Sequence, residues 1–391
     1  MKVEVTMDKQ NKIDILTHLV QIDSANDHEK EVADYLEKLL TDHGITVKQV
    51  ETSKGRNNLI AELGKPDAKP VFAFAGHMDT VSFGDLDDWA HDPLSAEIHG
   101  DRLYGRGSAD MKGNLAAMVI AMIDLADSKT KIPGRIRLLA TVGEEYGAAG
   151  SKQLTEQGEV DDVDGMIIGE PTSGDVVYAH NGSLNYTVTS EGTPVHSSIP
   201  EQGVNALTNL VKFVNAEADL FTDVKPSKEV GPLVHSITIF NSGDQVNTIP
   251  GHAELQGNIR ATPEFGNGAV IKRLNMITRG LSSAPGADLS FNVDMSFDPM
   301  VTDKEDPLVQ LAQTESSKAL NREVELKVIH GATDASEYRK AENQFPIIVL
   351  GSGDWENAHK MNEYVELSQF LVIDDVYKEV ALKALKELKK K

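Results

Sequence analysis

The sequence predicts a two-domain α/β protein in which one domain is inserted into the other. Short and almost continuous apolar runs alternate with helical patterns both early and late in the 391-residue chain, and a strand-rich stretch lies between them. Apolar runs of this kind are typical of parallel strands that helices cover on both faces. The length of the chain also exceeds what a single hydrophobic core usually supports.

The two flanking segments are expected to form the α/β domain. Apolar residues recur at helical spacing in the predicted helices, whereas the strands expected to be buried are short and nearly all apolar. The first segment predicts, in chain order, helices at 8–19 and 29–42, strands at 46–50, 59–63 and 71–75, a helix at 111–126, and strands at 136–142 and 166–168. The second segment predicts a helix at 308–320, strands at 324–329 and 347–350, and a closing helix.

The middle stretch is expected to form an inserted α+β domain. It predicts strands at 183–190, 234–241, 252–260 and 288–297, with helices at 204–218 and 268–281. The resulting order β-α-β-β-α-β fits a ferredoxin-like two-layer sandwich. We therefore expect residues 1–180 and 298–391 to form one discontinuous domain and residues 181–297 to form the insertion.

Composition and charge exclude several kinds of site and partner. The chain has no cysteine, which excludes disulfides, thiolate metal ligands and a cysteine nucleophile. A net charge of -23 repels nucleic acid and anionic lipid alike. No apolar run approaches the roughly 20 residues that cross a bilayer, and the first residues lack the hydrophobic core of a signal peptide. We expect a cytoplasmic protein with neither a nucleic-acid nor a membrane partner.

Polar side chains that can bind metal follow four of the predicted strands. His77 follows 71–76, Glu144 and Glu145 follow 136–143, Glu170 follows 166–169, and His359 lies in the loop after 347–351. Loops at the carboxyl ends of strands converge at one edge of an α/β sheet, where ligands bind. Each residue alone is more often a solvated or hydrogen-bonded loop residue. Their joint placement favours a metal-dependent hydrolase.

The motifs around these residues resemble a known family. They are GHMDTV at 76–81, GRGSADMKG at 105–113, GEEYGAAGS at 143–151, GEP at 169–171 and the late His359. Together they are similar to the co-catalytic zinc amidohydrolases and exopeptidases, and the likeness spans nearly the whole chain. The resemblance implies a zinc-exopeptidase-like catalytic α/β/α domain and a lid or dimerisation domain as the insertion.

The resemblance also implies two zinc ions per subunit, for which cobalt or manganese can substitute. Asp110 would bridge the two ions, His77 and Glu170 would complete one site, and Glu145 and His359 would complete the other. Asp79 would orient the His77 imidazole through its carboxylate, and Glu144 would act as general base. A cis peptide bond is expected between Asp110 and Met111.

Four further residues are expected to act on substrate by the same resemblance. His196 would reach the active site of a partner subunit in a homodimer formed through the lid, and would stabilise an oxyanion. Asn247, Arg260 and Thr333 match substrate-binding positions, and a guanidinium suits a carboxylate. The alternatives are a surface histidine at position 196 and a structural ion pair at Arg260.

The expected reaction is hydrolysis of an N-acyl amide of an amino acid. The first expected substrate is N-succinyl-LL-2,6-diaminopimelate, which would give succinate and diaminopimelate. N-acetylornithine, dipeptides and other acyl amino acids are alternatives. A metal-dependent binding protein without turnover is an alternative of a different class. A serine hydrolase lacks support because the sequence has no G-x-S-x-G motif.

Overall fold

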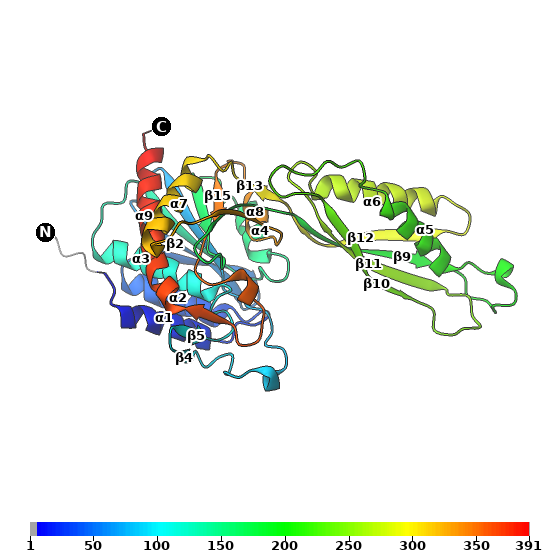
Figure 1. Ribbon diagram of the computed structural model, residues 1–391, viewed down its shortest axis with the longest axis horizontal. Coiled ribbons are helices and arrows are strands. Elements are labelled where there is room, and N and C mark those ends of the chain that lie inside the picture. The colour runs from blue at the N-terminus through cyan, green and yellow to red at the C-terminus, as the bar shows by residue number, and fades with distance from the viewer. Residues whose placement is uncertain (1–5, 391) are drawn as a thin grey trace. The chain divides into compact units, whose positions relative to one another are not determined.

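The computed structural model describes residues 6–390, which form two compact units (Figure 1). The first unit holds the described chain up to Tyr178, Thr302–Lys327 and the chain from Thr333 onward, whereas the second holds Ala179–Val301 and Val328–Ala332. Residues 1–5 and 391, which the predicted discontinuous domain includes, lie outside the described part. The chain therefore leaves the first unit and returns to it.

A large mixed sheet forms the centre of the first unit. Its strands follow the order β1-β2-β6-β3-β7-β15-β8-β13, and β14 pairs with β8. The bounds are β1 Thr46–Ser53, β2 Arg56–Gly64, β3 Val71–His77, β6 Arg135–Thr141, β7 Gly165–Ile168, β8 Val176–His180, β13 Met300–Val301, β14 Leu326–Ile329 and β15 Ile347–Val349. Strands β6, β3, β7 and β15 are adjacent and parallel. Every residue of β3 and β7 is buried, as the apolar runs predict.

Helices pack around this sheet and against one another. The most apolar helix, α3, is buried along nearly its whole length and packs on α1 and α9, while α7 packs on α9 (Figure 1). The bounds are α1 Lys9–Gln21, α2 Lys30–Asp42, α3 Lys112–Asp127, α4 Ala149–Glu156, α7 Pro307–Leu320, α8 Ala335–Tyr338 and α9 Leu367–Leu388. None of the helices in the described chain is long and apolar enough to cross a bilayer.

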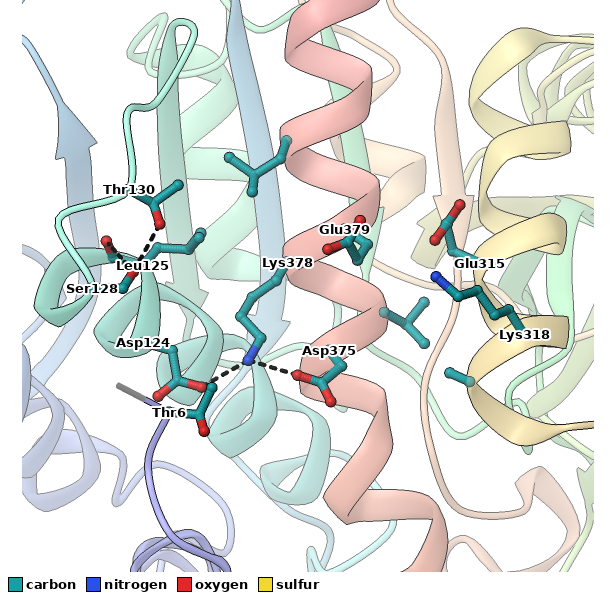
Figure 2. A pocket seen from close by; sticks show the side chains of 13 residues that line it. Thr6, Asp124, Leu125, Ser128, Thr130, Glu315, Lys318, Asp375, Lys378 and Glu379 are labelled. Carbon is teal, nitrogen blue, oxygen red and sulfur yellow. Dashed lines mark hydrogen bonds and ion pairs between the residues drawn. The ribbon is translucent and has the colours of Figure 1, made fainter. Parts of the chain in front are cut away.

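Buried charges join α9 to α3. Lys378 of α9 donates to Asp124 of α3 at 2.7 Å and to Asp375 at 2.6 Å, as Figure 2 shows at the wall of a pocket. Asp374 lies 3.4 Å from the Lys378 ammonium and also pairs with Lys12 of α1 at 2.7 Å. A network of ion pairs thus links α1, α3 and α9, in addition to the apolar contacts between these helices.

The second unit has the ferredoxin-like architecture that its element order predicts. Its antiparallel sheet has the order β10-β11-β9-β12. Two helices pack on one face of it (Figure 1), and alternate residues of β9 and β11 point into the core between them. The bounds are β9 Ser183–Glu191, α5 Ala206–Ala218, β10 Val234–Ser242, β11 His252–Arg260, α6 Asn267–Ser282 and β12 Asp288–Phe297.

Several short elements are absent from the predicted set. They include β8, β13, the helices α4 and α8, and a small sheet of order β16-β5-β4. The small sheet comprises β4 Ile98–His99, β5 Arg102–Tyr104 and β16 Tyr364–Glu366, and the short 3-10 helices are Leu86–Asp88, Pro200–Gln202 and Trp355–Asn357. Strands of two or three residues carry too little periodicity for sequence to reveal them.

Candidate active site

The parallel strands of the first unit bring the predicted ligands to one edge of the sheet. His77 is the last residue of β3, Glu144 and Glu145 follow β6, and Glu170 follows β7. His359 lies in the loop between β15 and β16. Because β6, β3, β7 and β15 are neighbours and run the same way, their carboxyl ends meet, as the sequence predicts.

Asp110 lies between the two histidines of the cluster. Its Oδ1 is 3.1 Å from His77 Nε2, and its Oδ2 is 3.2 Å from His359 Nε2. Each imidazole also faces a second carboxylate: His77 Nε2 is 3.8 Å from Glu170 Oε1, and His359 Nε2 is 3.1 Å from Glu145 Oε1. The five side chains thus form two halves that share Asp110. The peptide bond from Asp110 to Met111 is cis, as predicted.

Asp79 holds this cluster differently from the prediction. The His77 Nδ1–H donates to the main-chain carbonyl of Asp79 at 2.9 Å, whereas the nearer carboxylate oxygen is 3.7 Å away. The carboxylate instead accepts the main-chain N–H groups of Glu144 at 3.2 Å and Glu145 at 3.1 Å. Asp79 therefore orients the imidazole through its backbone and fixes the two glutamates through its side chain.

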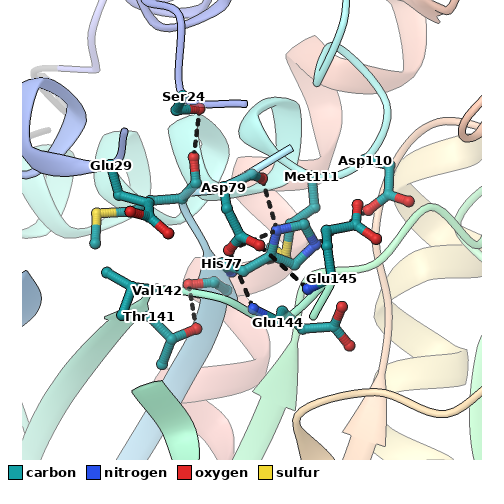
Figure 3. Close-up of polar contacts among 12 residues, drawn as sticks. Ser24, Glu29, His77, Asp79, Asp110, Met111, Thr141, Val142, Glu144 and Glu145 are labelled. Carbon is teal, nitrogen blue, oxygen red and sulfur yellow. Dashed lines mark hydrogen bonds and ion pairs between the residues drawn. The ribbon is translucent and has the colours of Figure 1, made fainter. Parts of the chain in front are cut away.

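The two adjacent glutamates leave their shared turn in different directions. Figure 3 shows the Glu145 carboxylate directed toward Asp110 and the Glu144 carboxylate directed away from it. The hydrogen bonds from both main-chain N–H groups to Asp79 hold this turn in place. One glutamate can therefore belong to the His359 half of the cluster while the other remains available for a proton.

Glu363 binds the main chain of the Asp110 segment, and no local sequence pattern indicates this role of Glu363. Its fully buried carboxylate accepts the main-chain N–H groups of Ala109 at 2.9 Å and Asp110 at 3.0 Å. It also accepts the Arg106 guanidinium at 2.7 Å. Because all three donors lie more than 250 positions away in sequence, only the folded structure reveals this clamp on the Asp110 segment.

The carboxylates of the cluster exceed the positive charge that its histidines can supply. Burial and the neighbouring acids raise the pKa of both Glu144 and Glu170 well above the ordinary range. Burial and Asp110 likewise raise the pKa of Glu145, while hydrogen bonds to Asp110 and Glu145 raise the pKa of His359 to about 10. Divalent cations would stabilise the ionised carboxylates. Imidazole nitrogen with carboxylate oxygen is also a donor set that zinc accepts, so the residues fit a metal centre.

The lid residues predicted from the resemblance lie in the second unit. His196 and Thr248 form a β-bridge, and the Ser197 N–H donates to the Asn247 carbonyl at 2.9 Å, so His196 and Asn247 are neighbours. Both side chains are exposed. The Ser198 N–H donates to His196 Nδ1 at 3.2 Å. The Ser198 hydroxyl lies 2.8 Å from the same nitrogen, so Ser198 contacts the ring on its Nδ1 side.

Arg260 and Thr333 have contrasting surroundings. Arg260, the last residue of β11, is partly buried, and burial lowers its pKa. No charged group among residues 6–390 is paired with it, which does not favour the structural-ion-pair alternative. Thr333 lies in the first unit, is fully buried, and accepts the Ala335 N–H on its hydroxyl at 3.2 Å. Its hydroxyl therefore supports the start of α8.

Comparison with known proteins places the chain in a family. Residues 73–383 match the model of peptidase family M20/M25/M40. The chain belongs to this family. A probable succinyl-diaminopimelate desuccinylase of Staphylococcus epidermidis is 37% identical to this M20 chain. The alignment is 401 residues long with its gaps and covers 96% of the chain and 98% of the relative.

Solved structures have the same fold as this M20 chain. A Staphylococcus aureus tripeptidase matches with a TM-score of 0.77 at 22% identity and covers 97% of this chain and 100% of its own. A Bacillus subtilis protein, described as a dinuclear metal-binding peptidase of the M20 family, matches with a TM-score of 0.73 at 16% identity, over 97% of this chain and 98% of its own. The chain is therefore an enzyme of the M20 peptidases and amidohydrolases, with their two-part α/β fold.

Proposed function

We propose that this M20 enzyme hydrolyses an amide bond with the help of two divalent metal ions, zinc being the expected metal. The observation that carries the proposal is the position of Asp110, whose two oxygens each face a different histidine. A carboxylate can bridge two cations, whereas a neutral imidazole binds one through a single nitrogen. His77 and Glu170 would hold one ion, Glu145 and His359 the other, and Asp110 both. The Bacillus subtilis protein with the same fold is described as a dinuclear metal-binding peptidase, which agrees with a proposal of two ions.

Glu144 is the proposed general base and acid. When bound, the metal ions supply a Lewis acid that polarises the substrate carbonyl and makes water more acidic. The Glu144 carboxylate would take a proton from the attacking water and pass it to the departing amine nitrogen. Burial and neighbouring acids raise the pKa of Glu144, which makes its carboxylate a better proton acceptor. The Asp79 hydrogen bonds keep it in position.

The proposed substrate is N-succinyl-LL-2,6-diaminopimelate, which would be cleaved to succinate and diaminopimelate. The support is the 37% identity to a probable succinyl-diaminopimelate desuccinylase over almost the full length of both chains. Arg260 offers a guanidinium that no described residue neutralises, and such a group suits a substrate carboxylate. Asn247 and Thr333 are the other proposed substrate-binding residues. The fold shared with a tripeptidase keeps peptides as the second candidate substrates.

We further propose a homodimer of a cytoplasmic enzyme, joined through the second unit. Its edge strand β10 exposes Val234, Ile239 and Phe240 at 52%, 44% and 40%, and an unpaired edge with apolar side chains is suited to pairing with another chain. His196 would serve the partner's active site. An N–H of its imidazole ring would be the donor that an oxyanion requires.

A substrate panel tests the proposed function. The metal-free protein is reconstituted with zinc and assayed for amine release from N-succinyl-LL-2,6-diaminopimelate, N-acetylornithine, and several dipeptides and tripeptides, with a chelated sample as control. We expect metal-dependent turnover that is fastest on the succinyl compound. Faster turnover of a peptide would keep the metal mechanism and replace the substrate. Turnover that persists in the chelated sample would contradict the metal mechanism.

A further inference from the structure

A second cluster of histidines and a carboxylate lies on the small sheet of the first unit. His91 Nδ1 and His99 Nε2 both lie 2.9 Å from the same oxygen, Oε2 of Glu97. Each of the three residues offers one potential ligand atom, and these three atoms lie within 4.8 Å of one another. Among residues 6–390, the only other three residues that meet this condition are His77, Asp110 and Glu145. The proposed catalytic reaction uses none of these three residues.

Contacts other than those with Glu97 also hold the two histidines beside each other. The Tyr104 ring lies 4.2 Å from the His91 ring and 6.0 Å from the His99 ring, and the two histidine rings are 4.6 Å apart. The Asn362 side chain accepts the N–H groups of Ala90 and His91 at 2.7 and 3.3 Å. His99 pairs with Arg102 in the β4–β5 hairpin. Ring packing and backbone hydrogen bonds therefore hold both rings toward one point.

Glu97 is held by the same hairpin. Its main-chain carbonyl accepts the Tyr104 N–H at 2.8 Å, so the carboxylate starts from a fixed backbone position directly before β4. The His91 side chain is 23% exposed, while those of Glu97 and His99 are 46% and 57% exposed. The cluster is thus ordered at its base and open to solvent at its tips, and an ion can enter without unfolding of the hairpin.

We propose that His91, Glu97 and His99 form an additional divalent transition-metal site, separate from the active-site cluster. The ion would bind His91 Nδ1, His99 Nε2 and a carboxylate oxygen of Glu97, and solvent would fill the remaining position. This inference is independent of the proposed function, since it uses none of the active-site residues.

The donor set and its spacing select the class of ion. Two imidazoles with one carboxylate suit zinc, copper and nickel, whereas calcium and magnesium prefer sites built from oxygen. Ligands about 2.0 to 2.1 Å from a tetrahedral zinc lie roughly 3.3 Å apart. The observed nitrogen-to-oxygen separations are 2.9 Å. The two nitrogen-to-oxygen separations therefore need to widen by only a few tenths of an ångström to suit zinc, and the two nitrogens already lie within 4.8 Å of each other.

Metal stoichiometry tests the site directly. The wild-type chain, the double variant His91→Ala/His99→Ala and the single variant His99→Gln are saturated with zinc, passed through gel filtration, and analysed for zinc per chain. The control is His252→Ala, because His252 and Glu191 form an exposed histidine–carboxylate pair, at 2.8 Å, that contains only one histidine. We expect both cluster variants to lose one equivalent relative to the wild type and the control. Equal zinc content in all four proteins would overturn the proposal.

Histidine resonances give a second readout that does not depend on activity. Isotope-labelled histidine is followed by nitrogen NMR during zinc titration of wild-type protein. Binding should shift the Nδ1 signal of His91 and the Nε2 signal of His99, because these atoms face Glu97, and magnesium should shift neither. A titration in which both signals stay unchanged would overturn the proposal even if total zinc content rises.

Discussion

At the scale of single residues, two adjacent glutamates have different proposed tasks. Glu145 faces His359 at 3.1 Å, while the Glu144 carboxylate is directed away from Asp110 (Figure 3). The Asp79 carboxylate fixes both through their main-chain N–H groups. This backbone geometry suits the proposed division into a metal-binding glutamate and a proton-transferring one.

Replacing Glu144 should remove turnover and leave the metal bound. Glu144→Gln keeps the size of the side chain but cannot accept the proton from water, so we expect kcat to fall by about 10²- to 10⁴-fold. Steady-state assays measure the rate, and metal analysis of the same sample measures occupancy. Loss of zinc in this variant would instead identify Glu144 as a ligand.

A buried histidine outside the active site should make stability depend on pH. Burial lowers the pKa of His180 from 6.5 to about 4, so the unfolded chain binds a proton that the folded chain does not. The contribution of neutral His180 to the free energy of unfolding is fully present above pH 6.5. As the pH falls from 6.5 toward 4, this contribution decreases by about 1.4 kcal/mol per pH unit. Urea unfolding at pH 7 and pH 5 should show a smaller loss for His180→Gln than for the wild type. Equal losses in the two proteins would contradict this reading.

At the scale of elements, buried ion pairs hold the closing helix α9 against α3. Lys378 has an exposed side-chain fraction of 11%, and its partner Asp124 has one of 4%. Removal of a buried partner leaves the opposite charge without compensation. The packing of α9 on α3 should therefore depend on Lys378 more than on any exposed lysine with a single partner.

Lys378→Ala should destabilise the first unit by about 3 to 5 kcal/mol, since the buried Asp124 would lose its cation. Lys38→Ala is the matched control, because Lys38 pairs with Asp42 on the surface of α2 at 2.7 Å, and such pairs contribute about 0.3 to 0.5 kcal/mol. Urea unfolding of both variants compares the two effects. A similar loss in the two variants would show that the buried network contributes no more than a surface pair.

Among the elements, the sequence predicts helices and strands that have a clear apolar pattern. It does not predict contacts between segments that are distant in the chain. Strands β3, β6, β7 and β15 are apolar runs, so their positions in the chain and the metal-competent residues that follow them could be predicted, whereas their order in the sheet was not. Strand β8 follows a turn and has only five residues, too few for a periodic pattern to separate it from its surroundings. The hydrogen bond from His77 to Asp79 is accepted by a main-chain carbonyl. Because every residue has such a carbonyl, the residue type does not indicate this bond. The Glu363 clamp joins distant segments, so no spacing indicates it.

At the scale of the whole molecule, the proposed homodimer would join two chains into one working unit. His196 lies in the second unit, at an exposed position, and the proposed role requires that it serve the partner's active site. His196→Ala should lower kcat by about 10²- to 10³-fold with metal content unchanged, which is the usual effect of removing an oxyanion donor. Assays with the metal-loaded variant measure this loss.

Mixed dimers separate a role in the partner's site from a role in the chain's own site. A His196→Ala chain keeps its own Glu144, and a Glu144→Gln chain keeps its own His196. When the two inactive variants are mixed and allowed to exchange subunits, one site in each mixed dimer regains both residues. We expect activity to return on mixing. A mixture that stays inactive after confirmed exchange would contradict action across subunits.

The central claim is that Asp110 lies between two metal ions, and anomalous X-ray diffraction at the zinc absorption edge tests it most directly. Crystals of the zinc-loaded enzyme should show two peaks at the active site, one on the side of His77 and Glu170 and one on the side of His359 and Glu145, with the Asp110 carboxylate between them. A single peak in this cluster, or two peaks that Asp110 does not contact, would contradict the account.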